Sequence, residues 1–218
     1  MAELRSEEEQ LDVIKRWWKE NGTSLIAGAV IAAAGVFGWH AWQNYQEGQS
    51  AAASARYQQL VTISAAPEQS AEQFQTAQRL VNEINDDYGS TLYAELALLI
   101  EARLAVDQSD LDAAREALER AVDGASHDYL QSLARLRLAR VEIAQGNPEQ
   151  AITLLDEPMA DSLAAQRLDA RGDAFAALGD TQGAREAWQQ ALAADEQNQS
   201  LYGIQFKLDD LGAEEATS

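Results

Sequence analysis

The side chains that carry out most protein chemistry are scarce in this sequence. It contains two histidines, His40 and His127, and no cysteine, which excludes thiol catalysis, disulfides and thiolate metal sites. Neither histidine has further ligands at helical spacing, as a metal site would require. The sequence also lacks the glycine-rich motifs that bind phosphates, the G-x-S-x-G motif of serine nucleophiles and the H-E-x-x-H motif of catalytic zinc sites. We therefore expect a protein that is not an enzyme and that holds no cofactor and no metal.

Carboxylates are abundant, but their arrangement does not suggest acid–base catalysis. Pairs such as Asp86–Asp87 and Asp209–Asp210 are adjacent in the sequence, and adjacent residues do not share a helix face. The net charge of −20 argues against nucleic acid as a partner, since phosphate binding needs clustered Lys and Arg. The acidity indicates either a solvated surface, as in a salt-rich habitat, or a field that steers a basic partner.

The elements that carry these side chains should be helices. Alanine and leucine dominate, and only three prolines are present, so long unbroken helices are favoured. Residues 23–46 contain no Asp, Glu, Lys or Arg. A buried helix of a soluble domain would show a polar stripe, which residues 24–42 lack. A signal peptide would place its cleavage site directly after the apolar region, whereas the A-x-A pattern at 50–55 lies beyond bulky aromatic residues. A transmembrane helix fits best.

Aromatic and basic side chains flank this stretch as they flank membrane spans. At about 1.5 Å per residue, Trp18 and Trp39 would lie roughly 32 Å apart, close to the ~30 Å thickness of the bilayer core. Basic residues gather before the span, and only Arg56 follows within a similar distance, which predicts a cytoplasmic N-terminus. The predicted membrane-interface anchors are Lys15, Arg16, Trp17, Trp18, Lys19, Trp39, Trp42 and Tyr45.

Three later segments, 108–121, 145–158 and 178–191, share one pattern: a tight polar turn, then a helix with alanine at a fixed place and a large apolar residue four positions on. The turn positions are separated by 37 and 33 residues, a period that resembles the tetratricopeptide repeat. Small residues let two antiparallel helices approach, and large residues fill the space between successive pairs. A helical bundle without repeats is the alternative. The predicted packing residues are Ala114, Leu118, Gly146, Ala151, Leu155, Gly172, Phe175, Gly179, Ala184, Trp188 and Ala191.

In an array of helix pairs, the first helix of each pair lines a concave face. Leucines and arginines on that face would suit a partner segment with apolar anchors and acidic groups. The alternative is that the leucines pack beneath neighbouring helices. Arg103 and Arg140 occupy the same repeat position, which makes them the stronger candidates. The predicted partner groove consists of Leu96, Leu99, Arg103, Leu133, Leu136, Arg140, Gln166, Asp169 and Asp173.

Together these features predict an all-α protein in which a single N-terminal transmembrane helix precedes a tetratricopeptide-like helical-repeat domain, an α-solenoid. Two further helices, over 51–63 and 70–84, should come before the first repeat, and a terminal helix over 200–211 should cover the last one. We expect a short cytoplasmic tail at 1–22, the transmembrane helix at 23–46, the repeat domain at 47–211 and a frayed tail at 212–218.

The order of these parts resembles one known family. The segments LDVIKRWWKENG (11–22) and GWHAWQNYQ (38–46) bracket the span. Together with the repeat domain they resemble the YfgM-like family of ancillary SecYEG translocon subunits of Gram-negative bacteria. The resemblance implies an inner-membrane anchor, a periplasmic C-terminal domain, and association with the SecYEG translocon and a membrane-anchored periplasmic prolyl-isomerase-like chaperone. It implies a non-enzymatic adaptor that links emerging secretory proteins to periplasmic chaperones.

A second interpretation is an envelope scaffold or stress-response regulator that acts through self-association, as a homo-oligomer, without the translocon. Small residues four apart in the span, Gly28 with Ala32 and Ala34 with Gly38, would then bring helices of two copies together. An alanine-rich span without a helical partner would have the same sequence. Contacts with the channel, or contacts only between copies of the chain, would separate the two interpretations.

Overall fold

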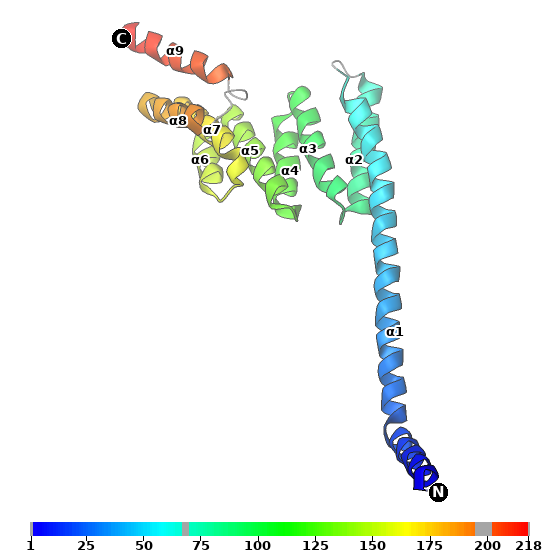
Figure 1. The fold of residues 1–218 in the computed structure, drawn as a ribbon. Coiled ribbons are helices and arrows are strands. Elements are labelled where there is room, and N and C mark those ends of the chain that lie inside the picture. The colour runs from blue at the N-terminus through cyan, green and yellow to red at the C-terminus, as the bar shows by residue number, and fades with distance from the viewer. Residues whose placement is uncertain (1, 67–69, 195–201, 218) are drawn as a thin grey trace. The chain divides into compact units, whose positions relative to one another are not determined.

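The computed structural model describes residues 2–66, 70–194 and 202–217. Within these ranges the chain forms helices and contains no strand (Figure 1), which confirms the predicted all-α class. Two compact units are present, Met1–Ala51 and Ala52–Ser218. The elements are α1 (Ala2–Ser64), α2 (Ala71–Tyr88), α3 (Leu92–Asp107), α4 (Leu111–Gly124), α5 (Asp128–Ala144), α6 (Pro148–Asp156), the 3-10 helix η1 (Asp161–Leu163), α7 (Ala164–Ala177), α8 (Thr181–Ala194) and α9 (Tyr202–Thr217).

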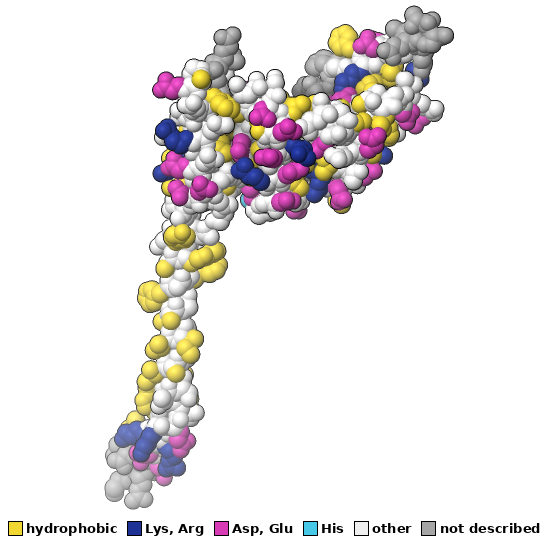
Figure 2. Space-filling view, turned by 180° about the vertical axis from the view of Figure 1, so that it is seen from behind, with side chains coloured by type: hydrophobic (Ala, Val, Ile, Leu, Met, Phe, Trp, Pro, Cys, Tyr) yellow, Lys and Arg dark blue, Asp and Glu magenta, His cyan; other side chains and the backbone are white. Residues whose placement is uncertain are grey.

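The first unit is the N-terminal part of α1, which is unbroken from Ala2 to Ser64. The sequence has no proline before residue 67, so no backbone N–H is missing from the helical hydrogen-bond ladder. Figure 2 shows hydrophobic side chains along this part of the helix, with basic and acidic side chains gathered near its N-terminal end. The helix continues through residues 23 and 46. The predicted limits of the span are therefore marked by side-chain polarity and not by a change in the backbone.

The second unit is built from helices that pack on one another in chain order. From α2 to α9, neighbouring helices are in contact, and α5 also contacts α3 and α7 directly. Four hydrophobic clusters follow one another, drawn mainly from α1–α3, α3–α5, α5–α7 and α7–α9. One helix is thus shared between each cluster and the next. This is the arrangement of stacked repeat units, in which each unit buries its apolar face on its neighbours.

Three turns close helix pairs at the positions that the repeat alignment selects. Ser109, Gly146 and Gly179 have left-handed backbone, with φ of 61°, 83° and 79°. The residue after each one donates its N–H to the carbonyl five positions back, at 2.9 Å (Asp110 to Ala105), 2.8 Å (Asn147 to Glu142) and 2.9 Å (Asp180 to Phe175). These are Schellman C-caps, which require a positive φ at this position. Glycine adopts it freely, whereas the Cβ of Ser109 makes it strained.

The remaining helices differ from the predicted ranges mainly at their ends. The predicted helix over 51–63 is the last part of α1, and that over 70–84 is α2, which starts at a capping box formed by Ser70 and Gln73. The predicted terminal helix corresponds to α9; its first two positions, 200 and 201, lie outside the described residues. α9 extends to Thr217, past the predicted limit at 211, because residues 213–216 are strong helix formers. Ser218 also lies outside the described residues.

Candidate functional site

The candidate membrane anchor is the apolar part of α1. Within Glu9–Ser64 this helix is long and apolar enough to cross a membrane, and only 6% of its most apolar window is buried by the rest of the structure. A core helix of a soluble domain would be mostly buried, so that alternative does not fit. The eight predicted interface anchors are all exposed, and the rings of Trp39 and Trp42 lie 5.3 Å apart. His40 is exposed on the same helix.

Most of the predicted packing residues lie between the paired helices of the second unit; Gly146 and Gly179 lie instead in exposed turns, and Phe175 is half-buried. Five of them are fully buried: Ala114, Ala151, Leu155, Ala184 and Ala191. Leu118 is 1% exposed and Trp188 is 4% exposed. The tightest approach is between α7 and α8: a Cβ added to Gly172 would lie 2.3 Å from Cδ1 of Trp188. The indole N–H of Trp188 donates to the Asp169 carbonyl at 3.2 Å and to the Asp173 carboxylate at 3.1 Å. Glycine at 172 is what lets the indole reach these acceptors.

The leucines of the predicted groove are partly or wholly covered. Leu99 and Leu136 are 5% and 2% exposed and belong to the α3–α5 and α5–α7 clusters. Leu133 is half-buried and packs against both clusters, and Leu96 is half-buried. These leucines pack beneath neighbouring helices. The accessible part of the predicted partner groove, called the inner face below, therefore consists mainly of its charged groups.

The charged groups of this face form a row at one repeat position: Arg103 on α3, Arg140 on α5 and Asp173 on α7. Arg103 donates to the carbonyl of Ser64, near the end of α1, at 2.5 Å. Arg140 lies 3.6 Å from the carboxylate of Asp169, which is mostly buried. The row is therefore basic on α3 and α5 and acidic on α7.

A third arginine, Arg137, joins this row and was not predicted. It is half-buried on α5, and its pKa is lowered by burial and by the nearby positive charges of Arg140 and Arg103. Its spacing of three residues from Arg140 places both on one helix face, and this spacing was the available signal. The repeat alignment did not select it because the equivalent positions in the other copies, Ile100 and Ala170, are apolar.

The acidic end of the row is covered by the chain's own last helix. The ammonium group of Lys207 on α9 lies 2.8 Å from Asp169 and 2.5 Å from Asp173, and 5.5 Å from the centre of a Trp188 ring. Burial lowers the pKa of Lys207, but the hydrogen bonds to the two carboxylates outweigh burial and raise it overall. Ile204 of α9 is buried in the α7–α9 cluster. Gln166, also predicted for the groove, is half-buried on α7.

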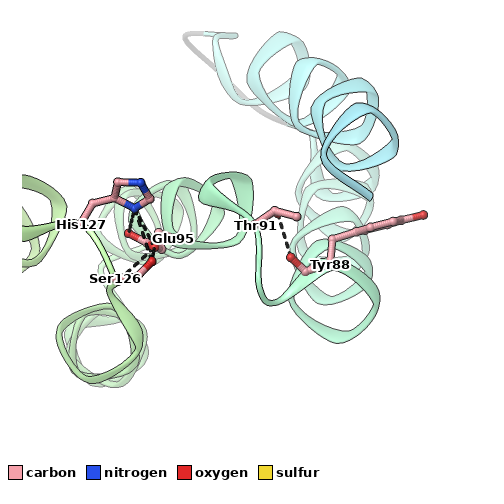
Figure 3. Close-up of polar contacts among 5 residues, drawn as sticks. All are labelled: Tyr88, Thr91, Glu95, Ser126 and His127. Atoms are coloured by element: carbon pink, nitrogen blue, oxygen red, sulfur yellow. Dashed lines mark hydrogen bonds and ion pairs between the residues drawn. The ribbon is translucent and has the colours of Figure 1, made fainter. Parts of the chain in front are cut away.

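His127 lies in a polar cluster whose geometry differs from a catalytic triad (Figure 3). It is the N-cap residue of α5, and its Nδ1 lies 3.0 Å and 3.2 Å from the two carboxylate oxygens of Glu95. The Ser126 hydroxyl donates to the same carboxylate at 2.6 Å, so its proton is directed at the acid and not at a histidine base. In a catalytic triad the histidine lies between the serine and the carboxylate, whereas here Ser126 and His127 each contact Glu95 directly. The cluster instead ties the start of α5 to α3, where Glu95 is buried.

Nearby, the Thr91 hydroxyl donates to the Tyr88 carbonyl at 2.8 Å in the turn between α2 and α3, as Figure 3 also shows. Among the residues that the structure describes, no group of three or more His, Asp or Glu side chains could hold a metal ion.

An exposed apolar helix followed by stacked helix pairs defines a helical-repeat protein with a candidate membrane anchor. Residues 15–213 match the family described as tetratricopeptide repeat-like domain. No solved structure matches the chain.

Four relatives carry the name ancillary SecYEG translocon subunit, and three of them are compared with the chain below. The chain is 33% identical to the one from Haemophilus influenzae over 198 residues (90% of this chain, 94% of the relative). It is 36% identical to that of Aggregatibacter actinomycetemcomitans over 192 residues (88% and 91%) and 30% identical to that of Escherichia coli strain K12 over 211 residues (97% and 99%). The chain therefore belongs to the family of ancillary SecYEG translocon subunits, which confirms the resemblance.

Proposed function

We propose that this protein is a non-enzymatic, membrane-anchored adaptor at the SecYEG translocon, and that its repeat domain links emerging secretory proteins to periplasmic chaperones. The observation that carries the proposal is the combination, in one chain, of an exposed apolar helix and a helical-repeat unit with a charged inner face. The relatives that share both parts over nearly their full length are named as subunits of the translocon. A membrane-anchored prolyl-isomerase-like chaperone is the partner we propose on the periplasmic side.

The proposed topology follows from the charges around the apolar stretch. Lys15, Arg16 and Lys19 precede it, and cytoplasmic flanks carry the excess of Lys and Arg. The N-terminus would therefore stay in the cytoplasm, and the repeat domain would lie in the periplasm. Trp17 and Trp18 would then mark one interface, with Trp39, Trp42 and Tyr45 at the other.

Anchoring explains how such an adaptor can work through weak contacts. A domain tethered beside the channel meets its partners at a high effective concentration, so that modest affinities are sufficient. Binding and not chemistry is the proposed activity, because the chain is built as a helical-repeat domain and its relatives are named as subunits of the translocon.

The experiment is a pull-down of the tagged full-length protein from membranes in mild detergent, with the bound proteins identified by mass spectrometry. A control chain carries an unrelated transmembrane helix in place of residues 23–46. Recovery of SecYEG together with a periplasmic chaperone is the expected result, and the control shows whether the span or the repeats hold each partner. Recovery of neither, with contacts only between copies of the chain, would overturn the adaptor and favour the scaffold that acts through self-association.

A further inference from the structure

The acidic end of the inner face contacts α9, a helix that packs mainly on α8. Lys207 inserts between Asp169 and Asp173 of α7, while the apolar side chains Ile204 and Leu211 are buried beside it. The acidic end of the charged row is thereby paired with the one cation of α9, a helix that also carries Asp209, Asp210, Glu214 and Glu215. The contact shows that a cation from a packed helix can satisfy the carboxylates of the row.

At α3 and α5 the row is basic, and the described part of the chain supplies little counter-charge there. Arg103 and Arg137 have no carboxylate partner among the described residues, and the one carboxylate near Arg140, that of Asp169, also binds Lys207. Several arginines elsewhere in the domain are paired, as Arg56 is with Glu83, Arg120 with Glu101 and Arg171 with Asp156, whereas Arg79, Arg135 and Arg167 have no ion pair among the described residues.

The contrast matters because of the composition of the domain. Residues 47–218 carry 30 acidic and only 12 basic side chains, so carboxylates are available to pair with nearly every arginine. Gathering three arginines without them costs free energy through the repulsion of like charges. The lowered pKa of Arg137, caused by burial and by its two basic neighbours, reflects that cost. An incoming carboxylate would relieve it.

Two aromatic side chains stand near Arg103, at one end of this cluster. The rings of Tyr57 on α1 and Tyr93 on α3 lie 5.6 Å apart and are half-buried, and the positive charge of Arg103 acts on the Tyr57 hydroxyl. A partly exposed aromatic pair next to a cationic cluster gives an apolar anchor and a charge anchor within one surface.

We propose that Arg103, Arg137 and Arg140, with Tyr57 and Tyr93, form a binding surface for an acidic amphipathic helix of a partner protein. The helix would place its carboxylates on the three guanidinium groups and its apolar residues against the tyrosine pair. Nucleic acid is not the ligand, because a phosphate backbone needs a longer row of Lys and Arg side chains than these three arginines supply. This inference specifies the partner of the inner face in the proposed adaptor, and it rests on that function only for the identity of the partner.

The test uses the full-length chain in nanodiscs of zwitterionic lipid and a fluorescein-labelled helical peptide with leucine on one face and glutamate on the other. A second peptide has lysine in place of every glutamate. By fluorescence anisotropy, the glutamate peptide should bind at least about tenfold more tightly than the lysine peptide, and added salt should weaken it. Equal binding of the two peptides, or tighter binding of the lysine peptide, would overturn the inference.

The residues are tested with R140E, R137Q and a matched control, R79E. Arg79 is exposed on α2 and has no ion pair in the part of the chain that the structure describes, so R79E makes the same charge change away from the surface. R140E should lower the affinity for the glutamate peptide by about tenfold or more. R137Q should lower it by less than R140E does, and R79E by less than about twofold. An equal loss in R140E and R79E would show a general field effect and would contradict the proposed surface.

Circular dichroism checks that each variant is folded. If R140E is unfolded, R137Q and the comparison of the two peptides on the natural chain still decide the question. The peptide result is independent of the proposed function: the chain could bind the acidic helix and yet recover no translocon from membranes, or recover the translocon through its span and ignore the peptide.

Discussion

The close approach of α7 and α8 gives the sharpest test of the packing. Replacing Gly172 with Ala puts a Cβ 2.3 Å from Cδ1 and Nε1 of Trp188, well inside van der Waals contact. The indole is 4% exposed, so moving it away from the new Cβ disturbs its packing against α7 and α9. Overpacking of this kind costs about 1–3 kcal/mol. Displacing the indole also weakens its two hydrogen bonds, which contribute about 1 kcal/mol each.

One effect opposes this loss. Alanine is a better helix former than glycine by about 1 kcal/mol, so the net expectation is that G172A lowers the free energy of unfolding by about 2 kcal/mol. The assay is urea unfolding of the full-length protein in mild detergent, followed by circular dichroism and by tryptophan fluorescence. G203A is the matched control, because a Cβ at Gly203 on α9 meets nothing within 4 Å, and it should be neutral or slightly stabilising.

A double mutant shows whether the indole is the cause. W188L should remove most of the penalty of G172A, so that the two substitutions are strongly non-additive. If G172A is as stable as the natural protein, or if its penalty persists in full in the W188L background, the account of the α7–α8 contact is wrong.

Three further outcomes follow from the same contacts. Ser109 and Gly146 both have a left-handed backbone. S109G should therefore raise the free energy of unfolding by up to about 1 kcal/mol, and G146A should lower it by a similar amount. Urea unfolding measures both changes, and a stabilising G146A would contradict the turn geometry. Lys207 pairs with two partly buried carboxylates, so K207M should release α9 and make it accessible to limited proteolysis. K207R is the control that preserves the charge. If K207M is cut no faster than the natural protein, this ion pair does not anchor α9. Burial raises the pKa of Glu95, but hydrogen bonds from Ser126 and His127 outweigh burial and lower it overall. The stabilisation by the Glu95 carboxylate is therefore present above the unfolded-state pKa of about 4.3 and is lost as pH falls through the lower folded-state value. E95Q should lower the free energy of unfolding at pH 7 and have progressively less effect below about pH 4, and an effect independent of pH would contradict this assignment.

Helical periodicity was sufficient to predict the class of fold, the apolar stretch and the turns of the second unit. The turns were predictable because a helix pair closes through a left-handed residue, and glycine stands at two of the three positions. Position 109 was found only by alignment, since serine does not by itself signal a left-handed backbone.

The charged inner face was only partly predictable, because spacing along one helix does not say which helix lies across from it. Leu99 and Leu136 share a repeat position with Asp169, and only the packing of successive helices shows that the two leucines are buried. Arg137 was missed because the equivalent positions in the other copies, Ile100 and Ala170, are apolar. The contact of Lys207 with Asp169 joins residues 38 apart in the sequence, and no periodic pattern connects them.

The overlapping clusters of the second unit have a consequence for its lifetime in the cell. Because α3, α5 and α7 each contribute to two clusters, detaching α9 removes one wall of the last cluster and leaves the other three closed. Unfolding should therefore advance stepwise from the C-terminal end, one cluster at a time. A protease would meet short opened segments and not a globally unfolded chain, and partial degradation products should end near helix-pair boundaries. The inner-face arginines, two clusters away from that end, would be among the last residues to lose their structure.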